Sequence, residues 1–123
     1  MPDIKHSQVL PDVYVIEVSG QIIMGPEGQR VEKLIDELIH EGRKKVVFDL
    51  SNLTHIDSTG VGILVTSCGR MTAAGAELRL AALRPRVSDV MRVAKLDRII
   101  TFYPTVASAT ENFTSASSNG DND

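Results

Sequence analysis

Apolar residues recur along this chain with two different spacings that alternate from one segment to the next. Three segments carry them three and four positions apart, which is typical of one face of a helix. These segments hold Val31, Leu34, Ile35, Leu38 and Ile39; Val61, Leu64, Val65, Cys68 and Met71; and Val87, Val90, Met91 and Ala94. Gly42 and Gly75 follow the first two and favour a helix end, and Pro85 favours the start of the third.

Between these helices lie short runs of β-forming residues bounded by turn residues. The predicted strands are Ile4 to Leu10, Val13 to Ser19, Lys44 to Leu50, Glu77 to Ala82 and Ile99 to Tyr103. The first two are expected to form a hairpin. Within Glu77 to Ala82, the alternation predicts Leu78 and Leu80 inward and Glu77 and Arg79 outward. Gln21 to Gly28 holds several glycines and a proline and is predicted to be a loop.

A last short helix is predicted over Thr105 to Phe113, with Val106, Ala109 and Phe113 packed inward. The resulting order ββαβαβαβα predicts an α/β fold, a mixed sheet with a parallel portion and about four helices. A chain of 123 residues suffices for one domain and not for two. We expect that domain to span residues 1–113. Residues 114–123 hold one apolar residue and are predicted to be a disordered tail.

The stretch from Phe48 to Gly62 is where a buried strand gives way to a helix, and it carries the candidate site. Asp57, Ser58 and Thr59 are all helix-capping residue types, and they precede the apolar-periodic segment. If Asp57 caps the helix, Ser58 occupies the first helical position with a free hydroxyl, where the helix dipole favours an anion. Gly60 and Gly62 each cost about 1 kcal/mol relative to Ala in a helix. That cost indicates either close packing or a backbone open to a partner.

Enzyme chemistry at this corner is not indicated. His55, Asp57 and Ser58 are too close together on one extended segment to form a hydrolytic triad, because neighbouring side chains diverge. Gly60-Val-Gly62 lacks the lysine of a phosphate-binding loop. We predict no catalytic residue. On spacing alone, a structural role for Ser58 as a cap or filler is favoured over a modification site.

Composition excludes several other classes of function. Net charge is −3, which argues against nucleic-acid binding. Residues 84–98 carry five basic and two acidic side chains, a pattern that favours a solvated helix face over an anion-binding patch. A single cysteine, Cys68, supports neither a disulfide framework nor a cysteine metal site, and no metal or cofactor is expected. No apolar run is long enough to span a membrane, and a cytoplasmic protein is expected.

The motif Val47-Phe-Asp-Leu-Ser-Asn-Leu-Thr-His-Ile-Asp-Ser-Thr-Gly-Val-Gly62 resembles that of the STAS-domain anti-sigma-factor antagonists of bacteria, and the resemblance extends from Val13 to Phe113. It implies a regulatory binding protein without enzymatic activity. The serine of the motif, here Ser58, would be phosphorylated by a serine kinase that is also the anti-sigma factor, and a metal-dependent serine phosphatase would remove the phosphate. The unphosphorylated form would bind the kinase and release the sigma factor. Asp57, Ser58, Thr59, Gly60 and Gly62 would form the partner-binding surface.

One segment departs from the family pattern. Many members carry acidic residues after the glycine that closes the second strand, in a stretch that contributes to partner contact, whereas Gly20-Gln-Ile-Ile-Met-Gly25 has none. An alternative interpretation is a STAS scaffold or subunit, for example of a membrane transport complex, in which Ser58 is only a cap. A small-molecule or nucleotide sensor is a third interpretation.

Overall fold

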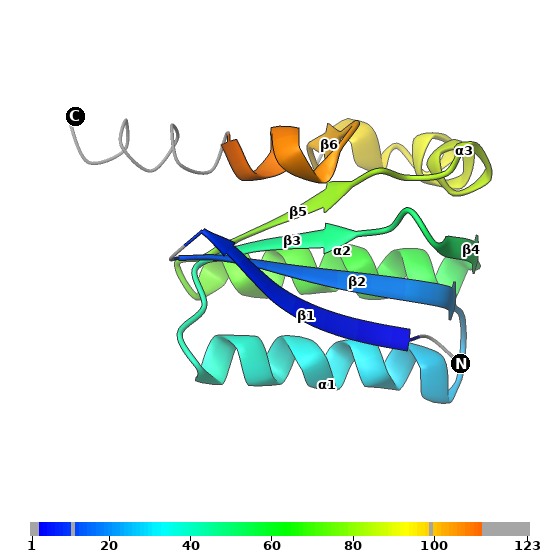
Figure 1. Cartoon of the computed structure of the whole chain (residues 1–123). Coiled ribbons are helices and arrows are strands. Elements are labelled where there is room, and N and C mark those ends of the chain that lie inside the picture. The colour runs from blue at the N-terminus through cyan, green and yellow to red at the C-terminus, as the bar shows by residue number, and fades with distance from the viewer. Residues whose placement is uncertain (1–2, 11, 99, 112–123) are drawn as a thin grey trace.

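The computed structural model of the chain describes residues 3–10, 12–98 and 100–111. Its strands are β1 (Asp3–Leu10), β2 (Val13–Ile22), β3 (Lys45–Asp49), β4 (Leu53–Ile56), β5 (Glu77–Ala81) and β6 (Phe102–Tyr103). Its helices are α1 (Pro26–His40), α2 (Ser58–Ala73) and α3 (Pro85–Val93), followed by a 3₁₀ turn (Leu96–Arg98) and a final helical segment over residues 106–111 (Figure 1). Ile99, Phe113 and the predicted tail 114–123 lie outside the described residues.

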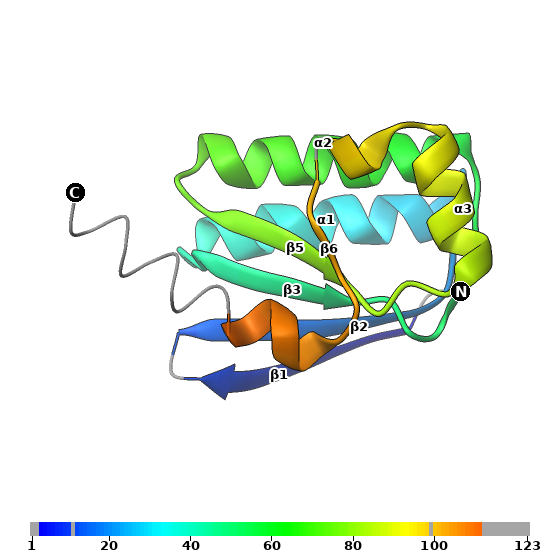
Figure 2. The same cartoon turned by 90° about the horizontal axis from the view of Figure 1, so that it is seen from above.

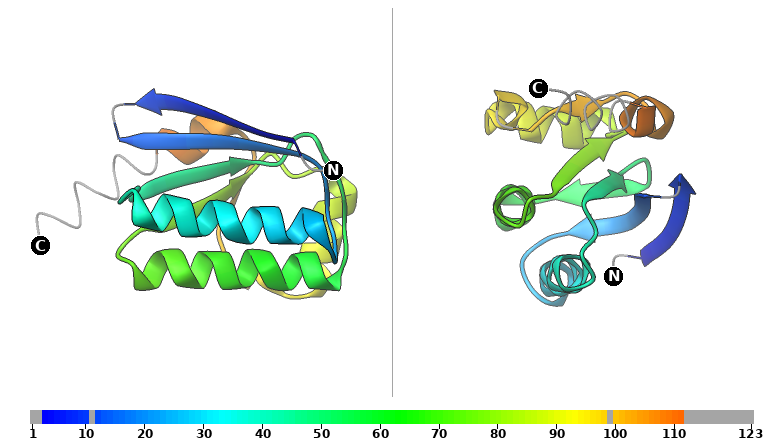
Figure 3. Two further views of the ribbon diagram at one scale, coloured as in Figure 1. Left: turned by 90° about the horizontal axis from the view of Figure 1, so that it is seen from below. Right: turned by 90° about the vertical axis from the view of Figure 1, so that its left-hand side faces the viewer.

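The strands form one mixed sheet in the order β1-β2-β3-β5-β6. β1 pairs antiparallel with β2, which confirms the predicted hairpin. The other neighbours in this order pair in parallel, and β4 adds a further parallel pairing to the far end of β2. Figures 2 and 3 show α1 and α2 side by side on one face of the sheet. The α/β fold predicted from the sequence is therefore confirmed.

Two apolar clusters hold the layers together. The larger lies between the sheet and helices α1 and α2, and Phe48, at its centre on β3, is fully buried. The smaller lies on the opposite face, where Val13, Val15 and Val47 pack against Ala109 of the final helical segment. Because β3 contributes to both clusters, its apolar residues run without alternation.

The prediction of a loop over Gln21 to Gly28 was wrong for most of these residues, because only residues 23–25 lie outside a strand or helix. β2 continues through Gly20 to Ile22, and α1 begins at Pro26. Gly20 has a φ of 89°, and the register shifts between Gly20 and Gln21 as β2 changes partner from β3 to β4. Glycine tolerates this left-handed geometry, so here it bends the strand instead of ending it.

β4 is absent from the strands predicted from the sequence. The segment is a short strand that pairs with β2, and its first residue, Leu53, is fully buried. Four residues with two exposed side chains in the middle carry too little pattern to be recognised as a strand. In α3, the predicted inward Ala94 lies just past the helix end and is exposed, whereas Val87 and Met91 are buried as predicted.

The buried face of α2 differs from the predicted one. Leu64 and Met71 are buried as predicted, but the other three predicted residues are not fully buried. Val61, Val65 and Cys68 are half-buried at the border of the core. The fully packed positions are Gly60, Ile63, Leu64, Ser67 and Met71. A pattern built from large apolar residues misses glycine and serine, although small residues are what allow a helix to approach a sheet closely. The predicted helix end at Gly75 is confirmed by its φ of 78°.

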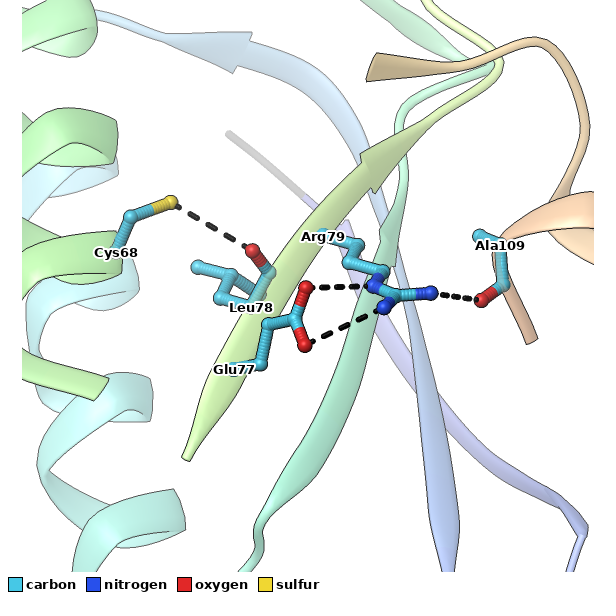
Figure 4. A network of polar contacts seen from close by, with 5 residues as sticks. All are labelled: Cys68, Glu77, Leu78, Arg79 and Ala109. Atoms are coloured by element: carbon cyan, nitrogen blue, oxygen red, sulfur yellow. Dashed lines mark hydrogen bonds and ion pairs between the residues drawn. The ribbon is translucent and has the colours of Figure 1, made fainter. Parts of the chain in front are cut away.

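Arg79 was predicted to point outward, but it is only 4% exposed. Its Nε and Nη2 donate to the Glu77 carboxylate at 2.8 and 3.3 Å, and Nη1 donates to the Ala109 carbonyl at 3.0 Å (Figure 4). Its guanidinium also lies 5.0 Å from the centroid of the Tyr103 ring. Arg79 faces away from the main core, as the alternation indicated, yet the final helical segment covers it. It thereby ties that segment to the sheet.

Replacing Arg79 with Met is expected to destabilise the protein by about 1–3 kcal/mol, because the buried Ala109 carbonyl loses its donor. Hydrogen exchange should show lost protection in residues 106–111 before any loss in α1. Glu77→Gln is the matched control. It alters only a half-exposed partner and should cost under about 1 kcal/mol. Equal protection of residues 106–111 in both variants would contradict the assigned role of Arg79.

Candidate functional site

The candidate site lies at one end of the molecule, where three connections meet (Figures 1 and 2). β4 ends at Ile56 and leads into α2 at Ser58. The turn between β2 and α1 and the turn between β5 and α3 lie at the same end. All three follow the carboxyl ends of parallel strands, the usual position for sites in α/β folds.

Asp57 is the N-cap of α2, as predicted, and its carboxylate does more than cap. Oδ1 accepts a hydrogen bond from the Gly60 amide at 2.8 Å. Oδ2 accepts one from the Met24 amide at 3.0 Å, in the turn between β2 and α1. These amides, Met24 first and then Gly60, lower the pKa of the Asp57 carboxyl. An ionised Asp57 therefore joins the two turns that border Ser58.

Ser58 and Thr59 occupy the first two positions of α2 and are exposed. Among the described residues, the Ser58 hydroxyl has no hydrogen-bond partner. No acidic residue lies in the first turn of α2, so the positive end of the helix dipole is offset only by the Asp57 cap. The arrangement presents an exposed hydroxyl at the positive end of the helix dipole, a position that favours an anion.

Gly60 and Gly62 have different roles, although they look alike in the sequence. Gly60 is buried, and a Cβ built on it would lie 2.0 Å from the Ile22 carbonyl oxygen. Gly62 is exposed, and a Cβ there would meet nothing within 4 Å. Gly60 thus allows α2 to pack on β2. Of the predicted surface residues, Ser58, Thr59 and Gly62 are exposed, whereas Gly60 is buried.

Met24 is a residue of this site that the sequence analysis missed. Its side chain is 72% exposed, and in the described part of the chain Met24 shares this degree of exposure, for a large apolar residue, with Val93. Asp57 accepts a hydrogen bond from its backbone amide, so Met24 is held next to the residue that caps α2. A methionine in a glycine-rich stretch gives no sequence signal, because only the structure shows that it is exposed and that Asp57 binds its backbone amide.

His55 does not join Asp57 and Ser58 in a catalytic arrangement. It is exposed, and its Nδ1 lies 2.9 Å from the Thr54 hydroxyl. Both Asp57 carboxylate oxygens are bonded to backbone amides. The base, acid and hydroxyl of a triad must be linked by hydrogen bonds in series, and these three side chains are not.

The sequence matches the family described as STAS domain over residues 5–109, and the protein therefore belongs to the STAS-domain family. A curated relative from Thermotoga neapolitana, a candidate anti-sigma factor antagonist, is 31% identical over 78 residues, which is 63% of this chain and 69% of the relative. A relative of the same description from Thermotoga maritima is 30% identical over the same length and shares of each chain.

Solved structures support the same fold. An anti-sigma factor antagonist from Mycobacterium paratuberculosis has a TM-score of 0.80 at 22% identity, covering 91% of this chain and 93% of its own. The Bacillus cell fate determinant SpoIIAA in its phosphorylated form has a TM-score of 0.68 at 18% identity, covering 90% and 99%. A sulfate transporter family protein from Wolinella succinogenes has a TM-score of 0.73 at 19% identity, covering 84% and 85%. Of the helices in the described ranges, none has the length and apolar character that a membrane crossing requires.

The two glycines provide a matched pair of substitutions. Gly60→Ala is expected to destabilise the protein by about 3 kcal/mol or more, because the added methyl group meets the Ile22 carbonyl and α2 must move. Gly62→Ala is expected to be neutral or to stabilise by up to about 1 kcal/mol, because the space is open and Ala is the better helix former. Urea denaturation measures both. Equal effects of the two substitutions would contradict the close packing of Gly60.

The lowered pKa of Asp57 predicts how its contribution depends on pH. A carboxyl whose pKa is lowered on folding stabilises the native state above its unfolded pKa of about 4, and that stabilisation disappears as pH falls through the folded pKa. Asp57→Asn should therefore be less stable than wild type at pH 7. The difference in stability between Asp57→Asn and wild type should decrease as pH falls below about 4. Thermal denaturation from pH 7 to pH 2 measures this difference in stability. A difference that does not change with pH would contradict a stabilising role of the ionised Asp57 carboxylate.

Proposed function

We propose that the protein is an anti-sigma-factor antagonist controlled by phosphorylation of Ser58. The observation that carries this proposal is the Ser58 hydroxyl, which is exposed at the first position of α2 and has no hydrogen-bond partner in the part of the chain that the structure describes. The curated relatives, described as candidate anti-sigma factor antagonists, support the same class of function. The proposed partners are an anti-sigma-factor serine kinase and a metal-dependent serine phosphatase. The unphosphorylated protein binds the kinase and releases the sigma factor.

The proposed switch acts through charge. A phosphate adds about −1.5 to −2 charges at neutral pH and is accepted by the free amides at the start of α2. The fold therefore has no strain to relieve and stays as it is. The partner, however, must then desolvate a hydrated dianion in the middle of a close-fitting surface beside Gly62 and Met24. Without a matching cation this costs several kcal/mol, a large part of the roughly 8 kcal/mol of a micromolar complex.

The fold likeness to a sulfate transporter family protein supports a second candidate function. In that case the chain is a fixed subunit or scaffold, Ser58 acts only as the first residue of α2, and no kinase modifies it. Incubation with the candidate kinases of the same genome and ATP, followed by mass mapping, separates the two. Phosphate on Ser58 supports the switch. No phosphate with any kinase supports the scaffold.

Ser58→Ala is expected to fold and to bind the kinase whether or not ATP is present, because it cannot be phosphorylated. Ser58→Glu is expected to fold and to bind at least ~10-fold more weakly, a loss of about 1.4 kcal/mol. Calorimetry of both variants, wild type and the phosphorylated protein measures these affinities. Thr66→Glu is the control, since it adds the same charge to an exposed position further along α2. Equal affinity of phosphorylated and bare protein would disprove the switch.

A further inference from the structure

A hollow lies on the surface beside the candidate site, at the same end of the molecule. Thr54 and His55 of β4 form one side of it, and Arg84, Pro85 and Arg86 at the start of α3 form the other. Its volume is about 340 Å³. None of the five residues is acidic. We refer to these five residues as the basic hollow.

The charges of the basic hollow are not neutralised within the described part of the chain. Arg84 donates from Nε to the Ser51 carbonyl oxygen at 2.7 Å, which fixes the guanidinium but leaves its charge uncompensated. Arg86 is exposed and makes no ion pair among the described residues. The next acid along α3, Asp89, is instead paired with Arg92 at 3.1 Å. The sequence analysis treated all these arginines as one solvated face, but the two at the start of α3 line the same hollow.

The hollow lies close to Ser58, because His55, which lines it, shortly precedes Ser58 in the chain. β4 runs directly from His55 to the Asp57 cap, and α3 packs against β4. A partner that covers the start of α2 therefore also reaches the basic hollow. Guanidinium groups bind carboxylates through paired, charge-assisted hydrogen bonds, and the hollow is large enough for one or two side chains. With a net charge of −3, the protein has no long-range attraction for an extended polyanion such as nucleic acid.

We propose that the basic hollow receives an acidic segment of the protein partner that docks over Ser58, with its carboxylates on Arg84 and Arg86. The proposal rests on the proposed function, because that function supplies the partner. It also adds a second effect to the switch. A phosphate on Ser58 lowers the positive potential at this end of the molecule and so weakens the attraction for the acidic segment, in addition to its own desolvation cost.

The first test uses the full chain and a blocked tri-glutamate peptide, followed by NMR of backbone amides and arginine side chains. Saturable shifts are expected at Thr54, His55, Arg84 and Arg86. The Kd should rise about fivefold or more in Arg86→Gln and stay unchanged in Arg92→Gln, which removes the same charge from the far end of the same helix. Shifts spread over all basic residues, or equal binding by the two variants, would overturn the proposal. So would equal binding of inorganic phosphate, which would indicate a small-anion site.

The second test uses a kinase that binds the wild-type protein. Arg86→Gln should weaken that complex about fivefold at roughly 50 mM salt and make affinity less sensitive to salt, whereas Arg92→Gln should change neither. If wild type binds and is switched by phosphorylation but Arg86→Gln binds equally well, the proposed hollow is wrong and the proposed function stands. If no kinase binds wild type, the proposed function is wrong, and the peptide titration alone decides the hollow.

Discussion

The Asp57 carboxylate holds together two parts of the chain that are 33 residues apart. One oxygen fixes the first turn of α2 and the other fixes the turn before α1. Ser58 directly follows Asp57, and Met24 donates its backbone amide to the Asp57 carboxylate. The position of Ser58 relative to Met24 therefore depends on this carboxylate. A serine could cap α2 equally well, but its side chain has one oxygen, and only a carboxylate offers a separate acceptor oxygen to each of the two backbone amides.

The fold was largely predictable because its elements have strong patterns. α1 and α3 have clear apolar faces, and β3 is a continuous apolar run. What could not be predicted depended on contacts between distant residues. β4 is recognisable only through its pairing with β2, and Arg79 is buried only because the final helical segment covers it. In both cases the deciding neighbour lies far away in the sequence.

The same distinction holds for the candidate site. The cap at Asp57 and the position of Ser58 follow from local sequence, because capping is a local interaction. The separate roles of Gly60 and Gly62 do not, since the Ile22 carbonyl that excludes a side chain at Gly60 belongs to another strand. Met24 and the basic hollow were missed for a similar reason. An exposed loop residue and two arginines can be recognised as parts of a surface only when their neighbours in space are known.

The bend of β2 at Gly20 has a consequence for how such a protein can diversify. Before the bend, β2 pairs with β3 in the central sheet, and after it β2 pairs with β4, while the Ile22 carbonyl lies directly against Gly60 at the start of α2. Effects of substitutions at separated sites are usually additive. Substitutions in the central sheet can therefore change thermal stability while leaving the start of α2 as it is, whereas substitutions at Gln21 or Ile22 also change how α2 is positioned.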